Sequence, residues 1–118
     1  MKRVASSLAL VMIAASLAVA APMQETVSGK VLDTACYAAG AHGPEEAGCT
    51  EMCLDMGVPA SLLTDDGRVL VLMPDKGDME PFKSLANHSA HQVKITGMVM
   101  ERDGLQAMTV TGIEHVGG

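Results

Sequence analysis

The sequence predicts a small, mainly β fold, and two observations support this prediction. Asp-Gly turn signals at residues 66–67 and 103–104 each lie between two apolar runs, which is typical of β-hairpins. Along residues 92–100, apolar Val93, Ile95 and Val99 alternate with the other side chains, which is the two-residue period of a half-buried strand. The chain has no Trp, one Tyr and one Phe, so its core must consist of aliphatic side chains and methionine.

Five strands are expected. The first spans residues 25–33 and bends at Gly29, a hairpin joins 62–63 to 69–73, and a second hairpin joins 92–100 to 105–113. Gly97 and Gly112 lie within the second hairpin and allow the bends or bulges with which a short sheet curls shut.

Two short helices interrupt the strand pattern. One is expected within residues 45–56, and the other follows Asp78, a candidate N-cap, with Phe82, Leu85 and Ala86 facing inward. A helix between the third and fourth of five strands is typical of the OB-type barrel. We therefore expect a small five-stranded OB-like barrel with one short helix in the cysteine segment and one between strands 3 and 4.

The first 20 residues have the three-part order of a secretory signal peptide. Lys2 and Arg3 precede an apolar run, and Ala18-Val19-Ala20 places small residues where signal peptidase reads them. The run is shorter than the roughly 20 apolar residues that a bilayer crossing needs. We expect cleavage after Ala20, no stable membrane anchor afterwards, and a single periplasmic or secreted domain at residues 21–118.

The predicted mature chain is acidic. Removal of the signal peptide takes Lys2 and Arg3 from the eight basic residues and none of the 14 acidic ones, so the net charge moves from −6 to −8. OB-type barrels that bind single-stranded nucleic acid need a basic groove and aromatic stacking platforms. With an acidic surface and two aromatic residues, this chain is not expected to bind nucleic acid.

Several motifs resemble those of a group of small exported bacterial proteins with an OB-like barrel and no settled function. They are Asp33-x2-Cys36-Tyr37, Cys49-x3-Cys53-x3-Gly57-x-Pro59, and Val93-x-Ile95-x-Gly97. The resemblance covers most of the mature chain and implies the fold and an exported location. In that group a His commonly stands three residues before the first Cys of the Cys-x3-Cys pair. Here that position is Glu46, and the nearest imidazole is His42.

Three cysteines in an exported chain leave one thiol over after a disulfide forms. On a regular helix, the Cβ atoms of Cys49 and Cys53 would lie about 5–6 Å apart, whereas a disulfide needs about 3.5–4.5 Å. A bridge from Cys36 to Cys49 or to Cys53 would close a loop of roughly 13 or 17 residues and stabilise the fold by about 3 kcal/mol. Both pairings remain open at this stage.

A soft-metal site is the alternative use of these cysteines. One stripe of the predicted helix carries Cys49, Met52, Cys53 and Met56. Thiolate and thioether ligands together select Cu(I). Three thiolates with His42 would suit Zn(II). Methionine at helical spacing is also ordinary core filler. A thiol redox role is the third hypothesis, although the surrounding acidic residues disfavour a reactive thiolate.

The remaining histidines give weaker evidence for a binding site. His88 and His91 lie in a polar stretch and are expected to face solvent, and His115 lies in a C-terminal tail expected to be mobile. The sequence contains no nucleophile elbow and no phosphate-binding loop. It therefore favours a non-enzymatic binding or accessory protein of the cell envelope, with a disulfide in the cysteine segment, over a copper or zinc binder or a thiol redox protein.

Overall fold

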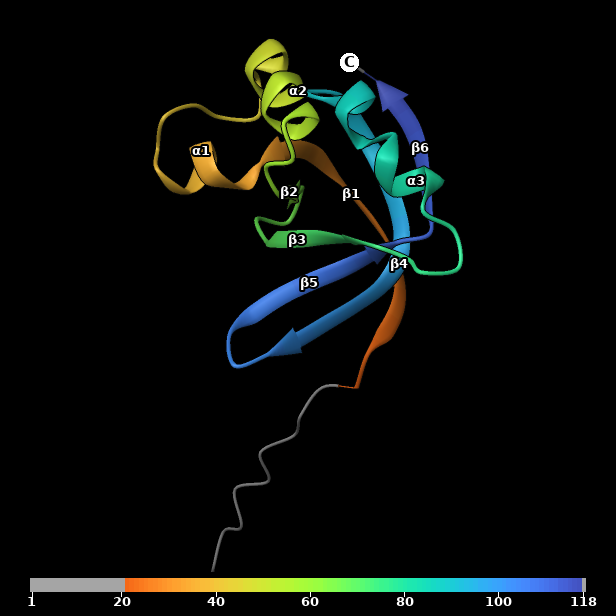
Figure 1. Cartoon of the computed structure of the whole chain (residues 1–118). Helices are drawn as coiled ribbons and strands as arrows, with labels where there is room; N and C mark the ends of the chain where they lie inside the picture. The colour runs from red at the N-terminus through yellow and green to blue at the C-terminus, as the bar shows by residue number, and fades with distance from the viewer. Residues whose placement is uncertain (1–20, 118) are drawn as a thin grey trace, which may run out of the picture.

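The computed structural model describes residues 21–117, so the predicted signal peptide at residues 1–20 lies outside the described residues. Within this range six strands are interrupted by two helical segments, one between β1 and β2 and one between β3 and β4 (Figure 1). The elements are β1 (Met23–Asp33), α1 (Thr34–Ala38), α2 (Ala47–Asp55), β2 (Ala60–Thr64), β3 (Val69–Pro74), α3 (Glu80–Lys83), the 3-10 helix η1 (Leu85–His88), β4 (Gln92–Arg102), β5 (Leu105–Val110) and β6 (Gly112–Gly117).

Five of the strands close into a barrel in the order β1-β2-β3-β5-β4, with β4 pairing back onto β1. The β3–β5 pair is parallel, and the other neighbours in the barrel are antiparallel. This arrangement confirms the predicted small five-stranded OB-like barrel. Both Asp-Gly hairpin turns are also confirmed, with Gly67 at φ 89° and Gly104 at φ 86° in the left-handed region that such turns require.

The barrel interior is aliphatic, as the shortage of aromatic residues requires. The middle of β1, β3 and the first half of β4 alternate a buried side chain with a more exposed one, whereas β2 is buried at nearly every position. The 3-10 helix η1 adds the buried Leu85 to this core. The buried cluster consists of Val27, Val31, Ala60, Leu62, Leu70, Leu72, Leu85, Val93, Ile95, Met108 and Val110.

Two backbone positions explain how so small a barrel closes. Gly29 is paired with both β2 and β4, and a Cβ atom placed on it would collide with the carbonyl oxygen of Leu63. Gly97 lies in β4 between the residues that pair with β6 and those that pair with β5. A Cβ atom there would collide with the carbonyl of Thr109. The predicted bends at these glycines are therefore sites of close approach between backbones.

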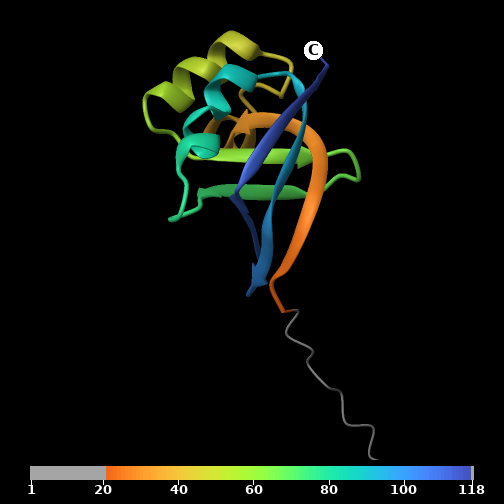
Figure 2. The same cartoon turned by 90° about the vertical axis from the view of Figure 1, so that its right-hand side faces the viewer.

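The run at residues 105–113 is not one strand, which corrects the sequence prediction. β5 ends at Val110, the Thr111 N–H donates to the Thr96 carbonyl (2.8 Å), and β6 then pairs with the first half of β4. Figure 2 shows β6 running alongside β4 up to the C-terminal end of the described chain. The chain bends here because β4 itself changes partner near Gly97.

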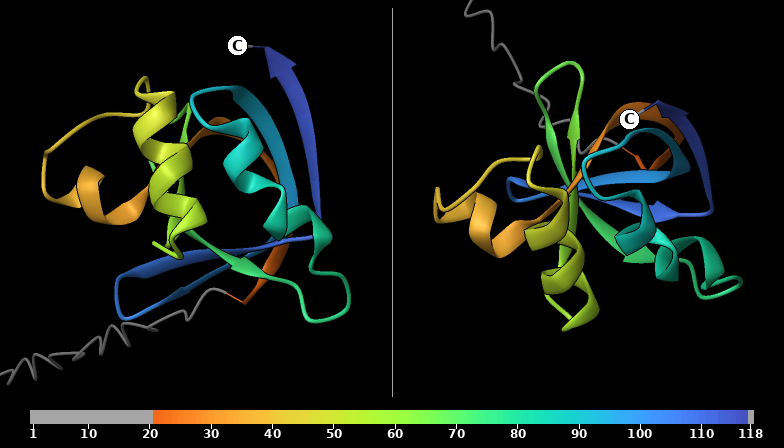
Figure 3. Two further views of the ribbon diagram at one scale, coloured as in Figure 1. Left: turned by 45° about the horizontal axis from the view of Figure 1, so that its top comes forward. Right: turned by 90° about the horizontal axis from the view of Figure 1, so that it is seen from above.

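The helical segments also differ in detail from the prediction. The cysteine segment holds two short helices, α1 and α2, and Figure 3 shows α2 beside the α3–η1 segment. Asp78 is not the N-cap of α3, although its Oδ1 accepts a hydrogen bond from the Glu80 N–H (3.0 Å). Phe82 packs against the buried cluster, as the predicted inward face requires, but it is only half-buried and also lines a cleft of about 360 Å³ beside α2.

Candidate functional site

The cysteine segment is organised by Asp33, the last residue of β1. Its side chain is fully buried, and its Oδ1 accepts a hydrogen bond from the Cys36 N–H (2.8 Å), which caps the N-terminus of α1. The strand therefore ends with a carboxylate that starts the next helix. The same contact places the Cys36 thiol next to Asp33.

Cys53 reaches the same carboxylate from α2. The sulfur atoms of Cys36 and Cys53 and a carboxylate oxygen of Asp33 all lie within 4.8 Å of one another, and both cysteines are half-buried. The three cysteines are unbonded in the structure. Two thiols and one carboxylate from three different elements thus converge on one point.

His42 lies beside this group and contacts its carboxylate, although its own ligand atoms group with Glu46 and Cys49. The α1 helix ends in a Schellman motif, in which Gly40 has φ 69° and the Ala41 N–H donates to the Cys36 carbonyl (2.9 Å). This turn sends the chain back over the site, so that His42 Nε2 lies 3.1 Å from Asp33 Oδ2. The His42 side chain is 9% exposed and the Asp33 side chain 0%.

The facing atoms of His42 and Asp33 are within ion-pair distance but are not aligned as a hydrogen bond. Among residues 21–117, neither His42 Nε2 nor Asp33 Oδ2 has a hydrogen-bond partner, and both atoms are buried. Buried polar atoms without partners are unusual, because each costs about 1–3 kcal/mol relative to a hydrogen-bonded one. Two such atoms that face each other mark this corner of the protein as a candidate binding site.

The four residues of the predicted α2 stripe do not share one environment. Cys49 is exposed and groups with His42 and Glu46, whereas Cys53 faces Asp33 and Cys36. Met52 is 58% exposed and Met56 is 71% exposed, so the interpretation of these methionines as core filler is wrong. The helix lies on the outside of the barrel and is only weakly amphipathic, and the face that it buries holds Thr50, Cys53 and Leu54 rather than the predicted stripe.

Asp33 is a candidate site residue that the sequence analysis named only as part of a motif. Its signal in the sequence is its position three residues before Cys36, at a strand end where an Asp commonly caps the next helix. The carboxylate raises the pKa of Cys36 to about 11, through a hydrogen bond with the thiol and through its negative charge, and partial burial and Cys53 add to the shift. Cys36 is therefore a protonated thiol at neutral pH and a poor nucleophile.

Replacement of Asp33 with Asn should lower the pKa of Cys36 toward that of an ordinary thiol, since the amide carries no charge. Because a raised pKa keeps the thiol protonated as the pH increases, wild-type Cys36 should gain reactivity only above about pH 10. The variant should gain it at lower pH. The measurement is the rate of Cys36 alkylation between pH 7 and 11, quantified by peptide mass spectrometry, with Cys49 as the internal reference. Identical pH profiles in both proteins would contradict the assigned role of Asp33.

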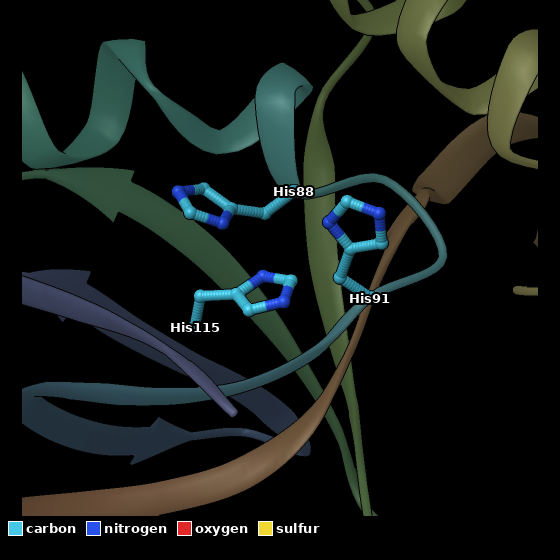
Figure 4. A group of neighbouring side chains, drawn as sticks. All are labelled: His88, His91 and His115. Carbon is cyan, nitrogen blue, oxygen red and sulfur yellow. The ribbon is translucent and has the colours of Figure 1, made fainter. Parts of the chain in front are cut away.

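A second group of possible ligands lies elsewhere in the fold and was not expected from the sequence. His88, His91 and His115 each offer a ring nitrogen within 4.8 Å of the other two, and Figure 4 shows their rings gathered together. The predictions that His88 and His91 face solvent and that His115 belongs to a tail are wrong. His88 and His91 are half-buried, and His115 belongs to β6, which pairs with β4.

The fold and the first site define a small OB-like barrel with a helical insertion that gathers cysteine, aspartate and histidine side chains at the end of β1. Comparisons with protein-family models, with curated proteins and with solved structures find no match to this chain. Among the described residues, no helix is long and apolar enough to cross a membrane.

Proposed function

We propose that this protein is an exported, non-enzymatic binding protein of the cell envelope that holds a soft metal ion, Cu(I) or Zn(II), between Cys36, Cys53 and Asp33, with His42 at the edge of the site. The observation that supports it best is the convergence of two sulfur atoms on a buried carboxylate whose second oxygen has no hydrogen-bond donor. The signal-peptide pattern and the resemblance to small exported proteins support the location.

The donor set fits a thiophilic ion. Thiolate ligands select Cu(I) and Zn(II), and Zn(II) also takes imidazole and carboxylate ligands. The N–O separation of 3.1 Å between His42 and Asp33 is close to that of two ligands on one tetrahedral zinc, for which bond lengths of about 2.0–2.2 Å imply roughly 3.3–3.4 Å. Neither atom would need to move far to become a ligand.

Electrostatics support the same assignment. In the absence of a cation, Asp33 opposes ionisation of Cys36 and so raises the pKa of that thiol. A bound metal ion reverses this effect, because its positive charge stabilises both thiolates and the carboxylate. The high pKa of Cys36 also disfavours the thiol redox hypothesis, since a redox cysteine needs an accessible thiolate.

The proposal predicts one tightly bound Cu(I) or Zn(II) per protein at this corner. The reduced, chelator-treated protein should take Cu(I) from a chromogenic chelator, and Cys53→Ser should lower the affinity at least tenfold, or ~1.4 kcal/mol. Cys49→Ser is the matched control, because Cys49 lies outside the Cys36–Cys53–Asp33 group, and it should bind nearly as well as the wild type. Equal affinity in the wild type and in Cys53→Ser would rule the site out.

A structural disulfide between Cys36 and Cys53 is the second candidate role for this pair. Their sulfur atoms lie within 4.8 Å of each other, and the bond would close a loop of about 17 residues. Cys49 would then remain as the free thiol. Intact mass and a thiol count on the exported protein separate the two roles, since a disulfide removes two hydrogen atoms, taken up by the oxidant, and a metal adds its own mass.

A further inference from the structure

We propose that His88, His91 and His115 form a second metal site, selective for a divalent transition-metal ion such as Zn²⁺. The site shares no residue with the cysteine site and takes its ligands from the end of η1 (His88), from the turn before β4 (His91) and from β6 (His115). It does not depend on the function proposed above.

The local backbone determines how the three histidines meet. The His91 N–H donates to the His88 carbonyl (3.0 Å), and Ala90 lies between them at φ 63°, in the left-handed region. This tight turn folds His91 back toward η1. Directly after it, Val93 pairs with His115, and the β4–β6 ladder shifts register between Gln92 and Val93. The turn and the register shift bring three imidazoles to one place.

The rings are arranged around a common point. The ring centroid of His115 lies 4.7 Å from that of His91, at an interplanar angle of 86°, and 6.1 Å from that of His88, at 37° (Figure 4). These rings are therefore not stacked face to face, and one nitrogen of each lies within 4.8 Å of the others.

The hydrogen-bonding state of the histidines indicates that a partner belongs at this point. His88 Nδ1 and His91 Nδ1 are buried, and neither has a hydrogen-bond partner within residues 21–117. A buried donor or acceptor without a partner destabilises a protein, so such atoms are usually bound to water, protein or a ligand. A metal ion would bind imidazole nitrogens that the protein itself leaves unsatisfied.

The protonation state is suited to metal binding. Burial lowers the pKa of His88, and its proximity to His115 and His91 lowers it further, because a charge on one ring opposes a charge on the next. A lowered pKa favours the neutral imidazole, which is the form that coordinates metal.

The chemistry of the ligands defines the class of ion. Imidazole suits Zn²⁺, Cu²⁺ and Ni²⁺, whereas Mg²⁺ and Ca²⁺ require oxygen ligands, and Cu(I) prefers the thiolates of the other site. Three histidines leave a fourth tetrahedral position for water or an outside ligand. His115 is exposed, so solvent and ions reach the site directly.

The test is calorimetric titration of the untagged, chelator-treated protein with Zn²⁺, combined with NMR of the histidine ring protons. His115→Ala is the diagnostic variant, because an exposed residue can be replaced without loss of the fold. It should lower the affinity of one site at least tenfold. In the wild type, the ring signals of His88, His91 and His115 should shift together on addition of Zn²⁺.

Two control variants separate this site from the cysteine site. His42→Ala removes the chain's remaining histidine and should leave the three-histidine site intact. Cys53→Ser should weaken binding at the thiol-dependent site alone. Persistence of every Zn²⁺ binding event in His115→Ala, with no shift of the three ring signals in the wild type, would overturn the proposal. Loss of binding in Cys53→Ser alone would support only the cysteine site.

Discussion

Replacement of Gly97 with alanine is expected to destabilise the barrel by at least about 3 kcal/mol. A Cβ atom at this position would overlap the carbonyl oxygen and carbon of Thr109, which belong to the backbone of β5 and cannot rotate away. Relief of the collision would require β4 and β5 to separate where β4 changes partner from β5 to β6. Urea denaturation followed by circular dichroism measures the effect as a lower transition midpoint.

Gly48→Ala is the matched control for this substitution. Gly48 lies in α2, and a Cβ atom there would meet nothing within 4 Å. The same chemical change should therefore stabilise the protein slightly, by about 0.5–1 kcal/mol, because alanine restricts the unfolded chain and favours a helix. If the Gly97 variant were as stable as the Gly48 variant, the strands would not approach as closely as the structure indicates.

Replacement of Asp33 with alanine is expected to cost about 2–3 kcal/mol in the reduced, metal-free protein, from the lost helix cap and the lost buried contact with His42. The substitution removes the cap of α1 and leaves His42 Nε2 buried beside a methyl group. It should also disorder the α1–α2 segment, because Asp33 is the contact shared by Cys36 and His42. Denaturation in the presence of a chelator and a reducing agent measures the change in free energy.

Two further variants test whether the loss of stability arises from the contact between Asp33 and His42. If the cost arises from an unpaired buried group, Asp33→Ala with His42→Ala should cost less than the sum of the single substitutions. Asp55→Ala, at an exposed position of α2, should change the stability by no more than about 0.5 kcal/mol. Strict additivity of Asp33 and His42 would show that the two side chains do not interact.

The barrel was predictable because its signals are local. The Asp-Gly turns fix two hairpins, and the alternation of Val93, Ile95 and Val99 fixes which face of β4 is buried. The extra strand β6 was missed because residues 105–113 contain no Asp-Gly pair and no proline to mark the end of β5. Only the change of partner along β4 shows that the chain bends at Thr111.

The candidate sites were predictable only in part. The spacing of Cys36, Cys49 and Cys53 limits their possible pairings, but it does not say which helical cysteine faces Cys36. That choice depends on how α2 lies on the barrel, which places Cys53 beside Asp33 and leaves Cys49 exposed. The exposure of Met52 and Met56 has the same origin, since a helix of weak amphipathic character does not determine its own buried face.

The sequence by itself determined the strand periodicity, the turn positions and the aliphatic core, because each depends on side chains a few residues apart. The tertiary structure alone decided which distant residues meet. Asp33, His42 and Cys53 come together because β1 ends beneath α2 and a Schellman turn reverses the chain after α1. His115 joins His88 and His91 because β6 pairs with β4. Contacts between residues far apart in the chain depend on strand register and helix docking, which no short stretch of sequence encodes.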